Sequence, residues 1–514
     1  MTEKNMFRSL MGGAAFRTIS LFLNVAVAFF MMPYLIQNLG DYWYGIWVIV
    51  ATVIGYYGML DMGLSSACQR FLSKAYATGS RTEINSYLST GFFSFILVSF
   101  LFFIVTLALS GMSDLFFDEV DDASVFSLLM LLLGAKLLIT MPYNCYVGVI
   151  NAHFRYDIVS KIELVKTLAR AFGFYFLLDS GYGIISIAVC TTVIEVIGAF
   201  LLFFGAKSLD PDNSVSFRFY STKCLKEFFD FGKHSFVINI ANLFRFQLDS
   251  LVIAGMISVS MVTHFGVASR LIQYKGQLFD SIMGIFMPVF TKMHSLGRTE
   301  HLASRLRLVL GISSFLAFLL CSLPIVFGKS FILLWMGEDY LDAYYPLAAL
   351  SASSMFALCT YPLLPYLNAL AQHKKYAYIT LAESVLNIAL SILLAPSLGI
   401  LGVALGTAIS VLISKSLFIV PYAFRLSNMS LRSFYIPFFY RLLVSFVYFC
   451  SVFLICNFYC EIDSYLELVI YVFFSSAIYC FIYFYFLAEL ELRKYLFDKF
   501  PVRFHGVLKL LWRL

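Results

Sequence analysis

Charged residues are scarce in this sequence, and that scarcity excludes an ordinary soluble protein. Only 13% of the 514 residues are charged, whereas 61% are hydrophobic and the mean hydropathy is +0.85. A soluble domain is nearer half apolar and a quarter charged. The net charge of +6 is too small to indicate nucleic-acid binding. The composition therefore predicts an all-α polytopic membrane protein.

Patterns that would indicate other chemistry are also missing. The ten cysteines are scattered without a CxxC pair, so neither a disulfide framework nor a zinc site is indicated. No GxxxxGK[ST] phosphate-binding loop occurs, and the stretches between apolar runs are too short for an ATPase or a glycosyltransferase site. Residues 14–38 are too long for a signal-peptide core and predict a first span instead. We therefore predict neither an enzyme nor a cofactor.

Long apolar runs are what the chain does contain. A spanning helix needs ~20 apolar residues. Runs bounded by charged or turn-rich breaks predict about fourteen transmembrane helices, at roughly 14–38, 43–66, 87–111, 124–150, 157–178, 183–206, 233–257, 262–291, 305–328, 343–371, 377–396, 399–424, 433–456 and 466–488.

The loops between these runs alternate in charge. One set carries nearly all the loop lysines and arginines, while the other carries acids, as at residues 114–122, 338–342 and 461–463. Cytoplasmic loops retain cations. Both termini are therefore predicted to be cytoplasmic, in a multi-pass protein of the bacterial inner membrane.

The chain also repeats itself. A shift of 220 positions places residues 138–163 on 358–383, with polar residues, a proline and a cation in register, including Thr140/Thr360, Pro142/Pro362, Tyr146/Tyr366, His153/His373 and Arg155/Lys375. Because six helices separate the copies, both halves insert the same way, and two such bundles enclose a midplane cavity in transporters. The predicted architecture is a six-helix bundle (1–206), a cytoplasmic linker (207–232), a second six-helix bundle (233–427), two extra C-terminal helices (428–489) and a basic cytoplasmic tail (490–514).

Charges inside the predicted spans need an explanation, because each costs at least ~2.5–3.5 kcal/mol near the bilayer centre. Some can pair along one helix, as Glu163, Lys166 and Arg170 are spaced three and four apart. The cations outnumber the acids, however, and an anionic, phosphate-bearing substrate would balance them. The candidate substrate-binding residues are Arg17, Arg245 and Arg270, followed by Lys136, Lys166 and Lys275. The candidates for coupling to a proton or a sodium ion are Asp61, Glu195 and Asp249.

A family resemblance covers the first two predicted helices. Residues 31–79 contain the pattern LGxxxYGxW (Leu39, Gly40, Tyr44, Gly45, Trp47) and DMGL at 61–64, followed by the basic QRFLSKA. This stretch resembles the Wzx-type O-antigen flippases of the multidrug/oligosaccharidyl-lipid/polysaccharide exporter superfamily, and the six-plus-six repeat is similar throughout residues 1–430.

The resemblance implies a flippase that moves undecaprenyl-diphosphate-linked oligosaccharide repeat units from the cytoplasmic to the periplasmic leaflet. It implies an inward-facing cationic cavity, and membrane lipids and other polysaccharide-assembly proteins as partners. The count of fourteen helices also resembles the lipid II flippase, which implies that helices 13 and 14 help to bind the lipid tail.

Two alternatives remain open. One is a cation-coupled multidrug or metabolite exporter of the same superfamily, which would be expected to have an acid-dominated cavity. The other is a polytopic O-antigen polymerase or ligase, which would carry one large periplasmic loop.

Overall fold

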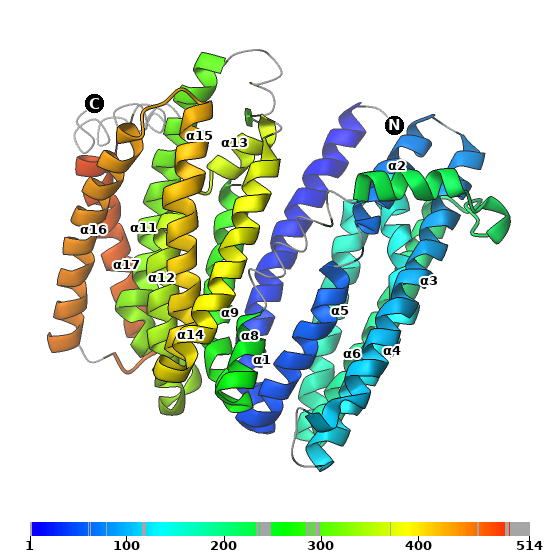
Figure 1. Ribbon diagram of the computed structural model, residues 1–514, viewed down its shortest axis with the longest axis horizontal. Helices are drawn as coiled ribbons and strands as arrows, with labels where there is room; N and C mark the ends of the chain where they lie inside the picture. The colour runs from blue at the N-terminus through cyan, green and yellow to red at the C-terminus, as the bar shows by residue number, and fades with distance from the viewer. Residues whose placement is uncertain are drawn as a thin grey trace. The chain divides into compact units, whose positions relative to one another are not determined.

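The protein is described by a computed structural model in two compact units, Met1–Leu243 and Phe244–Leu514 (Figure 1). The described residues are 3–59, 61, 63–78, 80–115, 120–232, 236, 248–283, 286, 289–290, 293, 299–370, 372–459, 462–488 and 493. Every regular element within these ranges is helical. We describe each unit by itself.

Unit 1 is a bundle of long helices. In it α3 packs on α4, α4 on α6, and α1 on α5. The side chain of Ser80 caps α3 by accepting the N–H of Glu83 at 3.3 Å. The elements are α1 (Glu3–Met59), α2 (Leu64–Thr78), α3 (Arg81–Gly111), η1 (Ser113–Leu115), α4 (Val120–Ala152), α5 (Tyr156–Asp179), α6 (Ile184–Leu209) and η2 (Phe217–Phe219).

The chain changes direction within α1, at Gly40. This glycine has φ 76° and ψ 164°, a conformation that is essentially restricted to glycine. On its two sides, the hydroxyl of Tyr34 donates to the carbonyl of Tyr175 at 3.1 Å, and the ring of Trp47 lies 6.4 Å from that of Phe174. A straight helix would separate Tyr34 and Trp47 by ~20 Å, so they could not reach the same turn of α5. The predicted spans 14–38 and 43–66 are therefore the two arms of α1.

The second arm ends at Met59, whereas the sequence predicted a span that continues to residue 66. It ends early because a separate helix follows. This helix, α2, was not predicted from the sequence. It is amphipathic, and one face is buried against α3 and α4 (Leu64, Ala67, Cys68, Leu72 and Ala75). Its polar face hides it from a search for apolar runs.

The predicted linker is bound to unit 1. The carboxylate of Asp210 accepts hydrogen bonds from Arg81 and Tyr76, both at 2.6 Å. Burial alone would raise the pKa of Asp210, but these hydrogen bonds outweigh it and hold the pKa below its usual value. Residues 222–232 are helical, and Tyr87 of α3 donates to Glu227 in this segment at 2.5 Å. The linker thus belongs to the folded part of unit 1.

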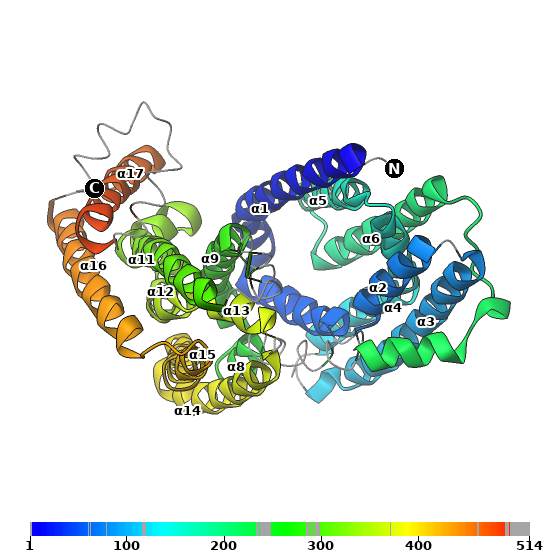
Figure 2. The ribbon, with the colours of Figure 1, turned by 90° about the horizontal axis from the view of Figure 1, so that it is seen from above.

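Unit 2 is also a helical bundle. Its last two helices, α16 and α17, pack on α11 (Figure 2). Tyr479 and Tyr483 are fully buried. The elements are α8 (Asp249–Met256), α9 (Val259–Met283), α11 (Thr299–Met336), η3 (Glu338–Ala343), α12 (Tyr344–Cys359), α13 (Leu363–Ala369), α14 (His373–Ile413), the π-helix η4 (Ser414–Ile419), α15 (Val420–Leu426), α16 (Arg432–Tyr459), α17 (Tyr465–Ile482) and the π-helix η5 (Tyr483–Leu487).

A second reversal occurs within α14, at Gly399 (φ 57°, ψ −141°). A Cβ on Gly406 would lie only 2.7 Å from the backbone nitrogen of Ser391. These two residues would be ~22 Å apart along a straight helix, so the two arms of α14 must lie against each other. The predicted span 377–396 lies in the first arm of α14. The predicted span 399–424 begins in the second arm, which ends at Ile413.

The helices are long and apolar, as expected for a multi-pass membrane protein. Nine helices in the described ranges have the length and composition to cross a membrane, and two of them, Phe22–Gly58 and Lys375–Leu426, each cover two predicted spans. The predicted spans 233–257 and 262–291 lie partly outside the described residues. The count of fourteen and the cytoplasmic termini therefore stay predictions. The predicted tail at 490–514 lies outside the described residues except for Arg493.

Candidate functional site

A cluster of charged side chains joins α5 to α6 in unit 1. Lys166 Nζ lies 2.9 Å from Glu163 Oε1 and 2.8 Å from Glu195 Oε2. Arg170 Nη2 lies 2.5 Å from Glu195 Oε1. The pair of Glu163 and Lys166 that their spacing predicted is confirmed. The bridge from both cations to Glu195 joins two helices and was not predicted.

Two further residues, Gly198 and Lys136, contribute to this cluster. A Cβ on Gly198 would lie 2.5 Å from Cδ of Lys166, so the glycine leaves room for the lysine stem to lie across α6. Lys136 reaches the cluster from α4 and interacts electrostatically with both Glu195 and Arg170. The cluster therefore draws its charges from three helices of one bundle.

Positive charge exceeds negative charge in this cluster. Its three cations, from α4 and α5, face two carboxylates, those of Glu163 and Glu195, and Glu163 is half exposed. Arg170 Nε is buried without a hydrogen-bond acceptor in the described part of the chain. A buried donor without an acceptor is costly. A bound anion would supply the acceptor and balance the charge, so this cluster is a candidate anion site.

A second polar cluster lies in unit 2, where α8 meets both arms of α14. Asp249 accepts hydrogen bonds from Asn387 Nδ2 at 3.3 Å and from Thr407 Oγ1 at 3.1 Å. Thr407 Oγ1 also lies 3.0 Å from Asn387 Oδ1 and 3.3 Å from the carbonyl of Val403. Ser391 Oγ lies 3.1 Å from Asn387 Oδ1. One carboxylate thus accepts from two neutral side chains, an amide nitrogen and a hydroxyl.

One hydroxyl of this cluster has more acceptors within reach than it has protons. The Thr407 hydroxyl has one proton but lies within hydrogen-bond distance of three acceptors. Asp249 has no ion-pair partner among the described residues. A carboxylate with amide, hydroxyl and carbonyl oxygens is the ligand type that hard cations prefer. The cluster can therefore hold a small hard cation.

Two glycines bring the arms of α14 close enough to form this cluster. A Cβ on Gly402 would lie 2.4 Å from the carbonyl oxygen of Leu394, and one on Gly406 would lie 2.6 Å from Ser391 Oγ. Glycines four residues apart allow two helices to approach closely in membranes. This approach places Thr407, the residue after Gly406, beside Asn387 on the other arm.

We expect Gly402→Ala to separate the arms of α14 and to destabilise unit 2. The added methyl meets a backbone carbonyl, which cannot turn away, and overpacking of this kind costs ~1–3 kcal/mol. Thermal unfolding of the purified protein should show a lower Tm. The matched control is Gly276→Ala on α9, where a Cβ would have nothing within 4 Å. Equal unfolding temperatures for the two variants would contradict the close packing of the arms.

The remaining predicted substrate-binding residues are dispersed. The side chain of Arg17 on α1 and the whole of Arg245 lie outside the described residues. Arg270 on α9 is exposed and donates to a glutamine one turn later on its own helix, at 3.3 Å. Lys275, also on α9, is buried beside the thiol of Cys321. The structure thus brings together Lys136 and Lys166, the two predicted lysines of unit 1, with Arg170.

The three predicted coupling carboxylates differ in surroundings. Asp61 is buried just before α2, where its carboxylate accepts the N–H groups of Gly63 at 2.9 Å and Ser65 at 3.0 Å, which is a helix-capping arrangement. Glu195 is paired with two cations. Asp249 accepts from neutral side chains, the amide of Asn387 and the hydroxyl of Thr407.

Asn387, Ser391 and Thr407 were missed from the sequence because they are neutral. A weak signal was present, since residues four apart lie on one helix face. Asn387 and Ser391 are spaced in this way in a strongly apolar stretch. Their connection to Asp249 depends on the reversal at Gly399, which composition does not reveal.

Comparison with known proteins gives two matches at the level of sequence. A family model described as polysaccharide biosynthesis protein matches residues 39–345. EpsK of Bacillus subtilis (strain 168), described as an uncharacterized membrane protein, is 26% identical over 415 residues, which cover 79% of this chain and 81% of EpsK.

Solved structures of transporters share the fold. The lipid II flippase MurJ in an inward closed conformation has a TM-score of 0.71 at 15% identity, covering 92% of this chain and 98% of MurJ. An inward-facing multidrug resistance MATE family transporter of the MOP superfamily has a TM-score of 0.66 at 14% identity, covering 80% of this chain and 95% of the transporter. At these identities the likeness concerns the fold alone.

Proposed function

Because this chain belongs to the polysaccharide biosynthesis protein family, we propose that it is a flippase for lipid-linked oligosaccharides. The proposed cargo is an undecaprenyl-diphosphate-linked repeat unit of O-antigen or a similar surface polysaccharide. It would move from the cytoplasmic to the periplasmic leaflet of the bacterial inner membrane. The observation that carries this proposal is the excess of cations around Glu195, among apolar helices.

The physical task of such a protein is to replace water around the cargo headgroup. Each polar group that loses its hydration without a new partner costs several kcal/mol, so a diphosphate with sugars cannot cross hydrocarbon unaided. Arg170, Lys166 and Lys136 would supply charge-assisted hydrogen bonds to the diphosphate. The prenyl chain stays in hydrocarbon throughout, and no covalent bond changes.

Transport would proceed by alternating access, in which the two related units expose the headgroup site first to one side of the membrane and then to the other. Arg17, Arg245, Arg270 and Lys275 remain proposed contacts for the cargo along this route.

The energy for directed transport would come from a coupling ion, which we assign to Asp249 rather than to Asp61 or Glu195. Its partners are a neutral amide and a neutral hydroxyl, and the oxygens of Asn387 and Thr407 suit a sodium ion, whereas Glu195 is already paired with cations and Asp61 caps a helix. Sodium would be a co-substrate here, held by Asp249, Asn387 and Thr407. A proton on Asp249 is the competing possibility, and the ion dependence of transport separates the two.

The leaflet distribution of undecaprenyl-diphosphate oligosaccharide tests the proposed function. In cells without this protein we expect the cargo to accumulate on the cytoplasmic face, and expression of the intact protein should relieve it. Expression of the double charge reversal Arg245→Glu with Arg270→Glu should not. An unchanged distribution, with intact surface polysaccharide, would overturn the proposal.

A cation-coupled multidrug or metabolite exporter is the second candidate, favoured by the shared fold with the MATE family transporter. It predicts export of organic cations that continues when lipid-linked oligosaccharide is absent. The excess positive charge around Glu195 would repel such substrates. A polymerase or ligase would instead change the chain length or the acceptor of the polysaccharide.

A further inference from the structure

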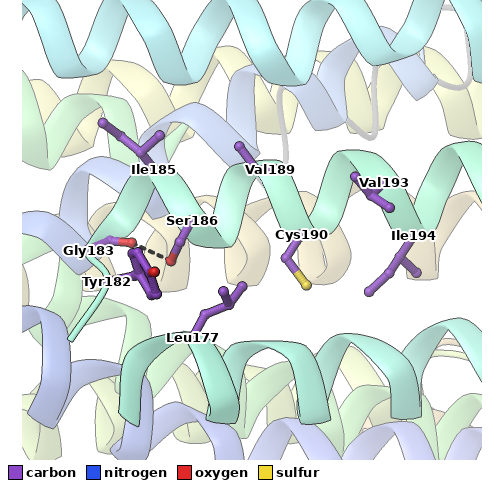
Figure 3. A pocket seen from close by; sticks show the side chains of 9 residues that line it. All are labelled: Leu177, Tyr182, Gly183, Ile185, Ser186, Val189, Cys190, Val193 and Ile194. Atoms are coloured by element: carbon purple, nitrogen blue, oxygen red, sulfur yellow. Dashed lines mark hydrogen bonds between the residues drawn. The ribbon is translucent and has the colours of Figure 1, made fainter. Parts of the chain in front are cut away.

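An apolar groove runs along α6 on the surface of unit 1. It has a volume of about 540 Å³, which is within the usual range for ligand pockets. Figure 3 shows Ser186, Cys190 and Ile194 in a row along α6, with Leu177 projecting toward them from α5. The lining residues are Leu177, Tyr182, Gly183, Ile185, Ser186, Val189, Cys190, Val193 and Ile194.

The walls of this groove are suited to hydrocarbon. The hydroxyl of Ser186 donates to the carbonyl of Gly183 at 2.7 Å, so it is already used within its own helix. Val189 and Val193 are exposed on the groove side of α6. An apolar surface of this kind in a membrane protein binds a lipid chain rather than a polar solute.

One end of the groove lies toward the charged cluster. Cys190, which lines the groove, would touch a Cβ placed on Gly173, one turn after Arg170. Ile194 also lines the groove and directly precedes Glu195, the partner of Arg170. The groove therefore lies between the same two helices as Arg170, whose Nε has no acceptor among the described residues, and its Ile194 end is one residue from Glu195.

The position of Arg170 along α5 decides which lipid fits. The residue is fourteen positions from Tyr156 and nine from Asp179, or ~21 Å and ~14 Å from the two helix ends at 1.5 Å per residue. The hydrocarbon core is ~30 Å thick. With α5 crossing the bilayer as the sequence predicts for residues 157–178, Arg170 would lie near mid-depth, beyond the reach of the phosphate of a resting phospholipid. A lipid phosphate reaches it only on a molecule that is being carried across.

We infer that this groove binds the polyprenyl chain of the lipid-linked cargo while its diphosphate lies against Arg170. This inference rests on the proposed function and adds the position of the polyprenyl chain on the protein. Between Ile194 and Ile185 the groove follows ten residues of α6, or ~14 Å. The first isoprene units would lie along this path, and the rest of the chain would extend into the bilayer.

Photocrosslinking tests the position of the chain directly. A photoreactive benzoylphenylalanine is introduced at Val193, which lines the groove, or at Ile197, one turn further along α6 and outside it. These residues are matched, with 50% and 52% exposure. In nanodiscs with radiolabelled polyprenyl-diphosphate oligosaccharide, we expect at least about tenfold more labelled adduct from position 193. Excess polyprenyl diphosphate should compete, and phosphatidylglycerol should not.

Equal labelling at the two positions would overturn the inference, as would adducts at position 193 formed with phospholipid alone. A transport assay separates this outcome from failure of the proposed function. Val193→Trp should lower transport by about tenfold, the factor expected when two chain carbons lose their contacts, and Ile197→Trp should leave it unchanged. If Val193→Trp transports normally while Arg170→Gln does not, the flippase stands and its chain lies elsewhere.

Discussion

Replacing Arg170 with glutamine should reduce delivery of the lipid-linked oligosaccharide to the periplasmic leaflet by about 100-fold, since removing one member of a desolvated charge pair costs ~2–5 kcal/mol. The variant removes the donor that has no acceptor among the described residues and leaves Glu195 with Lys166 and Lys136. The measurement is the leaflet distribution of the cargo in cells that depend on the variant.

A double variant separates contact with cargo from a structural ion pair. If Arg170 serves only to pair with Glu195, then Arg170→Gln with Glu195→Gln removes both charges together, while Lys166 keeps its pair with Glu163, and folding and transport should recover. If Arg170 contacts the diphosphate, the double variant should fold but remain inactive. The control is Lys161→Gln on the same helix, an exposed cation 3.3 Å from Asp157, which should transport normally. Recovery by the double variant would remove Arg170 from the proposed cargo site.

Asp249→Asn should abolish the dependence of transport on a sodium gradient. Asparagine keeps the shape and one oxygen of the side chain but removes its charge, so the cluster with Asn387 and Thr407 loses its only carboxylate. In proteoliposomes with a sodium gradient, we expect the variant to transport about 100-fold more slowly, a loss of ~2.7 kcal/mol. The control is Ser410→Ala, which should keep the sodium dependence. The hydroxyl of Ser410 donates to the backbone carbonyl of Thr407, at 2.9 Å.

Ion binding to Asp249 can also be measured without transport. A ligand that binds only the folded state raises its stability by RT ln(1 + [L]/Kd). The Tm of the native protein should therefore rise with sodium chloride but not with choline chloride at the same ionic strength, and the Tm of Asp249→Asn should respond to neither. If transport by the native protein depends on the pH gradient and its Tm does not change with sodium, the coupling ion is a proton and not sodium.

The sequence predicted the apolar helices of this fold better than the connections between them. The breaks near residues 40 and 399 were visible as gaps between apolar runs. Only the structure shows that Gly40 and Gly399 have positive φ and turn the chain back on itself. The amphipathic α2 was missed because half of its surface is polar, and a search by hydropathy averages the two faces.

The candidate sites show the same division between local and distant information. The pair of Glu163 and Lys166 follows from helical spacing and was predicted. The partnership of Lys166 with Glu195 depends on how α5 packs on α6, which the sequence does not reveal. The cluster around Asp249 needs neutral residues from two arms of α14, and such residues carry little signal in an apolar helix. Arg270 stood out because of its charge alone, and it lies exposed on α9.

The unlike chemistry of the two polar clusters bears on the internal repeat that the sequence predicts. If that repeat arose by duplication, both halves began with the same residues, and each could lose what the other retains. An excess of cations around Glu195 and a single carboxylate at Asp249 are the result expected if one copy specialised in binding the cargo and the other in binding the coupling ion. Selection for a new sugar would then act mainly on the first copy, while a change of energy source would act on the second.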